Sequence, residues 1–386
     1  MSRIDDLIAE YCPDGVKHQT LGEIGEFIRG NGIQKRDFQD SGFGCIHYGQ
    51  IYTYYGLFAD HTKSFIDPNL AEKRKKAYKG DLVIATTSEN EEDVCKACAW
   101  LGEEPIAISG DAYIFRHHQN PKYISYCFQS ELFQSQKKKY ITGTKVLRVN
   151  GDAMAKIHVP VPPLPVQEEI VRILDSFSSL EAELEAELEA RRKQYTHYRD
   201  ELLKFERVLI ASLGELCKIS VGRKNGTAGE FGEYPYVNAG TSMSGFVNEW
   251  SEEGDCVTTP SRGQGGMCFV AYQASRFWGG PLCYVMRSKH SDVMIKYVYY
   301  YLCSHKADIL GLVHEGGTPA INKSELAGLR ILVPPFEEQQ RIVSILDRFD
   351  KLTNDLSSGL PAEIEARHKQ YEYYRDRLLS FDELAA

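Results

Sequence analysis

Several glycine-punctuated segments carry side chains that form paired hydrogen bonds. The stretch FIRGNGIQKRDF, which starts at Phe27, sets arginine, asparagine, glutamine and lysine around two glycines, and similar groups recur after residue 220. Arginine can donate two hydrogen bonds to a guanine edge, and asparagine or glutamine can pair with adenine. The candidate base-contacting residues are Arg29, Asn31, Gln34, Lys35 and Arg36, and then Arg223, Lys224, Asn225, Arg262, Gln264, Asn322 and Lys323. Taken singly, each is more often a solvated surface group.

Two lysine-rich runs have the charge needed to bind phosphates. In the stretch AEKRKKAYK, Lys73 and Lys75 are candidates for contact with a DNA backbone, which basic side chains contact for position rather than for sequence. The run Lys137–Lys139 offers the same chemistry, and a solvated charged run explains it equally well.

The other motifs with reactive residue types are weak evidence for a metal site or an enzyme. Cys95 and Cys98 form one CxxC pair, but a zinc knuckle needs a second pair, for which His117 and His118 are the nearest candidates. Ordinary buried thiols are the preferred interpretation. The tetrapeptide VPPF resembles the Asp/Asn-Pro-Pro-Tyr/Phe element of adenine methylases, but Val333 lacks the polar group that this element requires. We therefore predict no metal and no catalytic residue.

The net charge of −9 is unevenly distributed over the 386 residues. Residues 160–206 and 333–386 sum to −5 and −4, residues 1–17 sum to −2, and the two large blocks 18–159 and 207–332 are each +1. An acidic total therefore does not exclude DNA as a ligand, since binding depends on the charge of one face.

The composition is ordinary for a globular protein, with 42% hydrophobic and 26% charged residues. No apolar run is long enough for a membrane span, and the N-terminus has no secretory signal. The ten cysteines form no disulfide framework. We expect a cytoplasmic protein that does not bind membranes.

One seventeen-residue phrase occurs twice. VPPLPVQEEIVRILDSF begins at Val161 and VPPFEEQQRIVSILDRF begins at Val333, 172 positions later. Downstream, EARRKQYTHYRDELLKF and EARHKQYEYYRDRLLSF start at Glu189 and Glu365, 176 positions apart. This spacing fits a duplicated domain with its connector and exceeds the repeat length of a solenoid.

Apolar residues in each copy recur at steps of three and four, which is typical of a coiled coil. The predicted helix-pairing residues are Ile170, Ile173, Phe177, Leu180, Leu184 and Leu188 in the first copy and Ile342, Ile345, Phe349, Leu352, Leu356 and Ile364 in the second. We expect two helices of about 40 residues. They would pack antiparallel, with four extra residues lengthening the second and Pro361 kinking or breaking it. Alternatively, each helix packs only on its neighbouring block.

The two blocks between these helices are weakly alike. TLGEI echoes SLGEL, and KYISYCFQS echoes KYVYYYLCS. Short β-branched and aromatic runs predict strands, and longer apolar runs predict helices. The expected strands are Gly44–Tyr48, Leu82–Thr86, Tyr113–Arg116, Cys256–Thr259, Met267–Ala271 and Leu282–Met286, and the expected helices are Tyr123–Phe133 and Val293–His305. Each block is predicted to be a mixed, strand-rich α+β domain.

The chain resembles the specificity (S) subunits of type I restriction–modification systems over nearly its whole length. The resemblance rests on the alternation of divergent block and repeated helix, and on the doubled pattern Pro-Pro-x-x-x-Gln-x-x-Ile-Val-x-x-Leu-Asp from Pro162 and Pro334. It implies an N-terminal segment (1–17), a first target recognition domain (18–159), a first spacer helix (160–206), a second recognition domain (207–332) and a second spacer helix (333–386).

The resemblance also implies a non-catalytic DNA-binding subunit. Each recognition domain would read one half of a bipartite site in double-stranded DNA, while the spacer helices set the gap and bind two methyltransferase (M) subunits. Motor–nuclease (R) subunits would join for restriction. S-adenosylmethionine, ATP and Mg²⁺ are expected on these partners and no cofactor on this chain. The alternatives are a coiled-coil adaptor without a DNA role, or a DNA methyltransferase or nuclease in its own right.

Overall fold

The structure is a computed structural model that describes residues 3–224, 228–263, 266–314, 316–355 and 357–384. It divides into two compact units. Unit 1 comprises Met1–Glu183 and Glu365–Ala386, and unit 2 comprises Leu184–Ile364. Three residues of the sequence predictions, Asn225, Gln264 and Leu356, lie outside the described residues.

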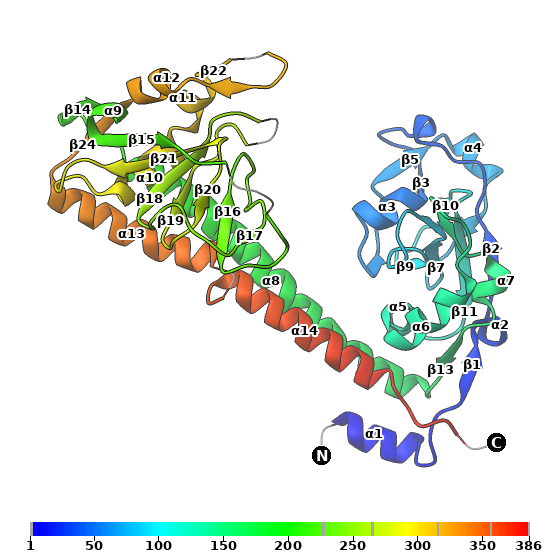
Figure 1. Ribbon diagram of the computed structural model, residues 1–386. Coiled ribbons are helices and arrows are strands. Elements are labelled where there is room, and N and C mark those ends of the chain that lie inside the picture. The colour runs from blue at the N-terminus through cyan, green and yellow to red at the C-terminus, as the bar shows by residue number, and fades with distance from the viewer. Residues whose placement is uncertain (1–2, 225–227, 264–265, 315, 356, 385–386) are drawn as a thin grey trace. The chain divides into compact units, whose positions relative to one another are not determined.

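Unit 1 contains a strand-rich α+β domain (Figure 1). Its five-stranded sheet has the order β2-β11-β7-β9-β4, and a four-stranded sheet has the order β5-β3-β10-β6. The strands are β2 (Gly25–Arg29), β11 (Ala112–His117), β7 (Leu82–Ala85), β9 (Lys96–Trp100), β4 (Phe58–Ala59), β5 (Ser64–Ile66), β3 (Phe43–Ile46), β10 (Ile106–Ile108) and β6 (Lys76–Ala77), with the ribbons β1 (His18–Thr20)–β13 (His158–Pro160) and β8 (Thr87–Ser88)–β12 (Leu147–Arg148). The helices are α1 (Arg3–Tyr11), α2 (Leu21–Ile24), α3 (Tyr48–Thr53), α4 (Pro68–Glu72), α5 (Pro121–Gln129), α6 (Glu131–Lys137) and α7 (Gly151–Met154), with 3₁₀ turns η1 (Lys35–Asp37) and η2 (Lys138–Tyr140).

Unit 2 repeats this plan with fewer strands in each of its two main sheets. Its four-stranded sheet has the order β15-β21-β18-β19, beside a three-stranded sheet β17-β16-β20. The strands are β15 (Cys217–Val221), β21 (Cys283–Ser288), β18 (Cys256–Pro260), β19 (Ala271–Gln273), β17 (Phe246–Val247), β16 (Tyr234–Val237) and β20 (Trp278–Gly279), with the ribbons β14 (Leu209–Ser212)–β24 (Arg330–Val333) and β22 (Val313–His314)–β23 (Ala320–Ile321). The helices of the domain are α9 (Leu213–Leu216), α10 (Ile295–Ser304), α11 (Lys306–Leu310) and α12 (Lys323–Gly328).

Most of the predicted strands and both predicted helices lie within two or three residues of observed elements, and one strand prediction is wrong. Met267 and Cys268 form a turn, closed by a hydrogen bond from Phe269 N–H to the Gly266 carbonyl, so β19 starts only at Ala271. The predicted helix Tyr123–Phe133 is two helices that meet at Ser130, whose hydroxyl accepts from the Phe133 N–H.

The echo between TLGEI and SLGEL is explained by helix capping. The Thr20 hydroxyl accepts from the Glu23 N–H, and the Glu23 carboxylate accepts from the Thr20 N–H at 2.7 Å. Ser212 and Glu215 form the same capping box at the start of α9. These hydrogen bonds from the cap residue lower the pKa of both glutamates. The repeated sequence therefore encodes a repeated helix start.

The repeated Gln of the Pro-Pro motif connects each spacer helix to the neighbouring domain. Gln167 accepts from the Asn120 N–H at 3.0 Å and donates to the Pro162 carbonyl at 2.7 Å. Gln339 accepts from the Met294 N–H and donates to the Pro334 carbonyl, both at 2.9 Å. Both glutamines are buried, so each satisfies backbone groups that would otherwise lack a partner.

The first spacer helix is one continuous helix, α8 (Leu164–Leu202), of 39 residues. The second consists of α13 (Phe336–Asn354) and α14 (Leu360–Leu378), of 19 residues each. The expected break is thus present, with Pro361 at the second helical position, where a missing N–H costs little. The expectation that four extra residues lengthen the helix is wrong, because they fall in the connection between Asn354 and Leu360.

Within unit 1, the first half of α8 and most of α14 lie side by side and run antiparallel (Figure 1). The rings of Phe177 and Tyr374 stack at 5.4 Å, and further along α8 Glu181 accepts from His368 at 2.7 Å. In unit 2, Tyr198 of α8 stacks on Phe349 of α13 at 5.7 Å. Aromatic side chains therefore supply much of the contact between the helices.

The predicted pairing residues take three different positions. Ile170 and Ile342 are fully buried in the core of the adjacent domain, so the start of each spacer packs on its own block. Ile173, Phe177, Leu184, Leu188, Ile345, Phe349 and Ile364 are half-buried. Leu180 and Leu352 remain 49% and 39% exposed. Packing on the neighbouring domain and pairing between the two spacer copies, which were alternatives from the sequence, are therefore both present. They occur at different positions along the same helices.

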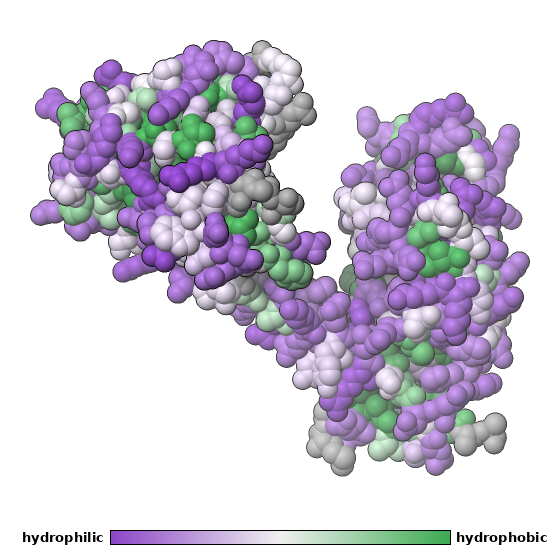
Figure 2. Space-filling model, in the orientation of Figure 1, coloured by the Kyte–Doolittle hydropathy of each residue, from purple (hydrophilic) through white to green (hydrophobic). Residues whose placement is uncertain are grey.

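No helix among the described residues is long and apolar enough to cross a membrane. The face of each unit visible in Figure 2 is mostly hydrophilic, with small apolar patches.

Candidate nucleic-acid interface

The loop that follows β2 in unit 1 is fixed by close backbone contacts. Gly30 donates to the Ala112 carbonyl, and Asn31 donates from its backbone to the Ile108 carbonyl. A Cβ on Gly30 would lie 2.2 Å from the Ser109 carbonyl oxygen, so only glycine fits there. The loop therefore leaves the sheet in one defined direction.

Asn31 joins this loop to the lysine-rich segment after α4. Its side-chain amide donates to the Lys73 carbonyl at 3.1 Å, and its oxygen accepts from the Lys75 N–H at 2.8 Å. The two basic segments, about 40 residues apart in sequence, are thus neighbours. Asn31 positions the loop, which is a role that its residue type alone did not reveal.

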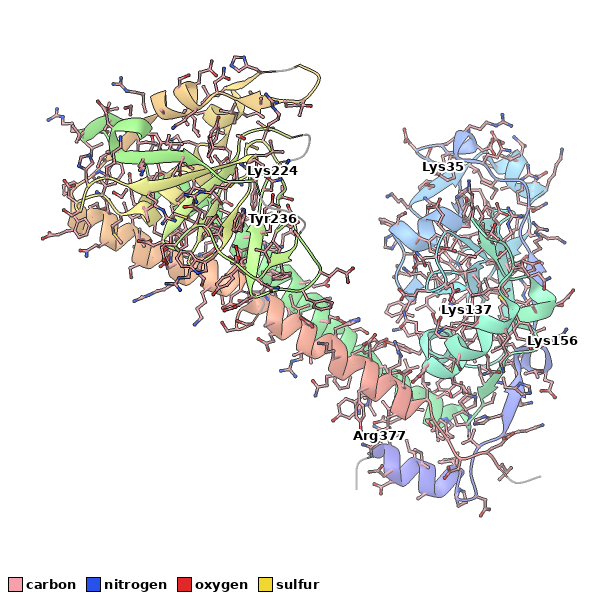
Figure 3. All side chains as sticks on the ribbon, viewed as in Figure 1. Lys35, Lys137, Lys156, Lys224, Tyr236 and Arg377 are labelled. Atoms are coloured by element: carbon pink, nitrogen blue, oxygen red, sulfur yellow. The ribbon has the colours of Figure 1, made fainter. Side chains whose placement is uncertain are left out.

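The joined segments expose a basic surface on unit 1, made of Gln34, Lys35, Arg36, Lys73 and Lys75. All five side chains are exposed. Figure 3 places Lys35 at one end of unit 1, remote from Lys137 and Lys156.

Two arginines support this basic surface of unit 1. Arg29 donates from Nε to the Gly110 carbonyl at 3.0 Å. Arg74 was not among the predicted residues, and its guanidinium lies against Gly32, where a Cβ would come within 2.6 Å of Nη1. The buried Nε of Arg74 has no hydrogen-bond partner. The only sequence signal for Arg74 is its place between two candidate lysines.

Unit 2 anchors its first candidate loop on the segment Gly279–Leu282. Arg223 donates from its backbone to the Gly279 carbonyl at 2.6 Å, and its own carbonyl accepts from the Trp278 indole at 3.0 Å. A Cβ on Gly222 would lie 2.3 Å from the carbonyl oxygens of Gly279 and Gly280. The side chains of Arg223 and Lys224 are left exposed.

The second loop of unit 2 lies beside residues almost 60 positions later. Arg262 forms an antiparallel bridge with Ala320, and Gly263 donates to the Pro319 carbonyl at 3.0 Å. Ser261 donates to the Leu282 carbonyl, which ties this loop to the segment that anchors Arg223. Burial raises the pKa of Tyr284, and the nearby positive charge of Arg262 opposes this shift.

Unit 2 therefore gathers its candidates into a second basic surface, made of Arg223, Lys224, Arg262, Asn322 and Lys323, all exposed. The loops that carry the first three are held by one backbone segment. A rigid anchor with free arginine and lysine tips suits contact with base edges and phosphates.

Lys137 corrects the phosphate hypothesis for the run Lys137–Lys139. Its side chain is 1% exposed, and its ammonium donates to the carbonyls of Glu91, Glu92 and Val94 at 2.7, 3.1 and 3.0 Å. Burial lowers its pKa. Lys137 therefore holds the loop before β9 and cannot reach DNA, while Lys138 and Lys139 are exposed.

Replacing Lys137 by methionine is expected to destabilise unit 1, because three carbonyls lose a charged donor. We expect a loss of about 2–4 kcal/mol. Scaled to a domain of this size, this corresponds to a melting temperature roughly 5–10 °C lower. Thermal unfolding followed by circular dichroism measures it. The control is Lys138→Met, which removes an exposed lysine; equal effects of the two changes would contradict the buried role of Lys137.

Of the cysteine and histidine candidates for a metal site, Cys95, Cys98 and His117 are buried, whereas His118 is exposed. Burial raises the pKa of both Cys95 and Cys98 to about 12, which disfavours thiolates. His117 accepts from the Gln119 N–H, and burial lowers its pKa to about 4. Among the residues that the structure describes, no group of three or more His, Cys, Asp or Glu side chains is placed to hold a metal ion.

The comparison with known families decides what this duplicated architecture is. The model of the type I restriction modification DNA specificity domain matches the chain twice, over residues 13–190 and 208–366. The chain belongs to this family. The type I specificity family thus accounts for both strand-rich domains and for the repeated spacer phrase.

Relatives in sequence carry the same description. The specificity subunit of the type I restriction enzyme EcoR124I/EcoR124II from Escherichia coli is 36% identical over 273 residues, which cover 60% of this chain and 65% of that subunit. The chain thus spans just under two thirds of this relative. A putative type I specificity subunit of Mycoplasma pneumoniae, S.MpnORF615P, is 33% identical over 59% of this chain and 94% of its own length.

Solved structures share the fold. The S subunit of a type I restriction–modification system from M. genitalium aligns over 94% of this chain and 96% of its own, with a TM-score of 0.61 and 14% identity. A chain from a study of complex assembly and conformational transition of the type I system aligns over 95% and 98%, with a TM-score of 0.59 and 16% identity. The predicted α+β class, with two strand-rich domains separated by long helices, is therefore confirmed.

Proposed function

We propose that this specificity-family chain reads a bipartite site in double-stranded DNA, each domain recognising one half. The observation that carries the proposal is the pair of basic surfaces, which are built on the same scaffold from different residues. In unit 1, Asn31 joins two lysine-bearing loops, whereas in unit 2 the segment Gly279–Leu282 anchors two arginine-bearing loops. Two domains that share a fold but expose different side chains could each recognise a different half-site sequence.

The spacer helices would set the gap between the half-sites and bind partner subunits. Their outer faces supply most of the negative charge, with −5 in residues 160–206 and −4 in residues 333–386. Such faces repel a DNA backbone and are available to a protein partner. The partners would be two methyltransferase subunits, and motor–nuclease subunits would complete a restriction complex.

The chain itself would be non-catalytic. S-adenosylmethionine would belong to the methyltransferase subunits, and ATP with Mg²⁺ to the motor–nuclease subunits. Val333, the residue that would have to hold an adenine amino group in a methylase motif, belongs to β24 and pairs with Leu209. Its role there is structural, which favours a recognition subunit over a methyltransferase.

The salt dependence of DNA binding tests this function. The chain assembled with its methyltransferase subunits is expected to bind fragmented genomic DNA and to lose about 10³–10⁵ in affinity between 50 and 200 mM salt, because each phosphate contact releases a counterion. Replacing Lys35, Arg36, Lys73 and Lys75 together by alanine should flatten the slope by about 3–4. A coiled-coil adaptor would give no DNA binding. S-adenosylmethionine bound by the purified chain alone would favour a methyltransferase.

A further inference from the structure

A polar cluster at the foot of the first recognition domain links it to its spacer helix. The Asp175 carboxylate on α8 accepts one hydrogen bond from the Lys122 ammonium at 2.7 Å and another from the Tyr126 hydroxyl at 2.8 Å. Lys122 and Tyr126 are four residues apart on α5 and therefore lie on one face of that helix. Each carboxylate oxygen takes one donor.

Unit 2 contains the same cluster. Asp347 on α13 accepts from Lys296 at 2.7 Å and from Tyr300 at 2.6 Å. Lys296 and Tyr300 are again four residues apart, on α10. The same geometry is thus present in two domains whose basic surfaces are formed by different residues.

The surroundings of the two clusters differ although their hydrogen bonds agree. Lys122 lies over the Phe58 ring at 3.7 Å, whereas Lys296 lies over the Tyr272 ring at 5.0 Å. Phe58 belongs to β4 of the five-stranded sheet and Tyr272 to β19 of the four-stranded sheet. The shared feature is therefore the connection between domain and spacer, and the packing around it has changed.

We propose that the two Asp–Lys–Tyr clusters are positioning joints that fix the angle of each recognition domain on its spacer helix and thereby sharpen the preferred gap between half-sites. This inference rests on the proposed reading of a bipartite site. The positioning residues are Lys122, Tyr126 and Asp175 in unit 1 and Lys296, Tyr300 and Asp347 in unit 2.

Stability alone does not explain why the joints are polar. The side chains of the two ion pairs are 23–37% exposed, and partly exposed pairs of this kind contribute little to stability because solvent screens them. The neighbouring apolar contacts of Ile170 and Ile342 hold each spacer helix against its domain. Apolar contacts are non-directional, however, and they tolerate small rotations. Hydrogen bonds weaken steeply when they are misaligned, so two donors one turn apart restrain rotation.

The position of the joint in unit 1 amplifies any rotation. Figure 1 shows α5 near the spacer helix, with β3, β5 and α4 at the opposite end of the domain. Figure 3 places Lys35 at that opposite end. A small change of angle at Asp175 therefore displaces the basic surface of unit 1 by much more than it displaces the joint.

The test uses Tyr→Phe changes, because the chain provides matched controls on the same helices. Tyr126→Phe with Tyr300→Phe removes one hydrogen bond from each joint. Tyr123→Phe with Tyr297→Phe removes hydrogen bonds of 3.0 and 2.6 Å to the backbone carbonyls of Pro160 and Leu332. Each complete complex is used to select DNA from a library in which the two half-sites are separated by gaps of every length from 4 to about 10 base pairs, a range that covers roughly 20 Å.

We expect the joint pair to keep both half-site sequences while its preference for the best gap over a gap one base pair longer or shorter falls about tenfold. The control pair should keep the preference of the unchanged protein. An unchanged preference in the joint pair, or an equal fall in the control pair, would overturn the inference. If the complex with Tyr126→Phe and Tyr300→Phe does not assemble, the double variant Lys122→Gln with Lys296→Gln replaces it in the DNA selection. The same two outcomes then decide the inference.

The unchanged complex separates this inference from the proposed function. If it selects no bipartite sequence, the proposed function fails and the joints lose their role with it. If the unchanged complex selects two half-sites with a strong preference for one gap length, and the variant with Tyr126→Phe and Tyr300→Phe has the same preference, only the inference about the joints fails.

Discussion

Replacing Arg262 by alanine is expected to abolish discrimination at one base pair of one half-site and to leave the other half-site unchanged. The Arg262 backbone is held by the bridge to Ala320, and its side chain is exposed. A bidentate arginine–guanine contact contributes about 1–3 kcal/mol of discrimination, which is roughly 5- to 150-fold in affinity. Competitive binding of duplexes that vary at each position of both half-sites, by the complete complex, measures this loss.

The matched control for this substitution is Arg330→Ala. Arg330 is also an exposed arginine of unit 2, but it begins β24, in the ribbon with β14, outside the second basic surface. It should lower affinity slightly and equally for all sequences. Equal weakening of both half-sites by Arg262→Ala would contradict the division of reading between the two domains.

Deleting Glu181–Leu184 is expected to shorten the preferred gap by about two base pairs. These four residues lie inside α8 and account for about 6 Å of helix, while one base pair adds about 3.4 Å of DNA. The second spacer copy is divided into α13 and α14, and the change of length can be absorbed where one helix ends and the next begins. Selection from a library of gap lengths gives the new preference.

Duplicating the same segment provides the opposite test. The duplicated chain should prefer a gap about two base pairs longer, and both variants should keep the original half-site sequences. If the gap stays the same in both variants, the spacer helices do not set it. A change in the half-site sequences would instead place base reading on the helices.

The sequence was sufficient to predict the repeated features, because each repeat satisfies local backbone requirements. The helix starts after the Pro-Pro pairs depend on residues within a few positions of one another. The capping boxes of Thr20 and Ser212 are equally local, but only the similarity of TLGEI and SLGEL was noted and the short helices α2 and α9 were not predicted. Pro361 likewise indicated the break between α13 and α14, because proline is accommodated at the start of a helix and not in its interior.

Long-range contacts could not be predicted from residue types. Lys137 belongs to a run that has the composition of a phosphate site, yet its ammonium is buried against the carbonyls of the segment Glu91–Val94. Arg262 lies beside Ala320 through a pairing that spans almost 60 residues. In both cases the deciding partner is a backbone group, which no side-chain pattern reveals. The position of Asn31 between two loops has the same origin.

The measurement that tests the central claim most directly is a map of methylated adenines across a genome in cells that express this chain together with its methyltransferase subunits. We predict methylation within two short, defined sequences separated by a gap of fixed length and unspecified sequence. Replacing residues 207–332 by the corresponding block of a relative should change one of these sequences and leave the other as it was. A single uninterrupted motif, or a map that changes at both halves after this exchange, would contradict the account.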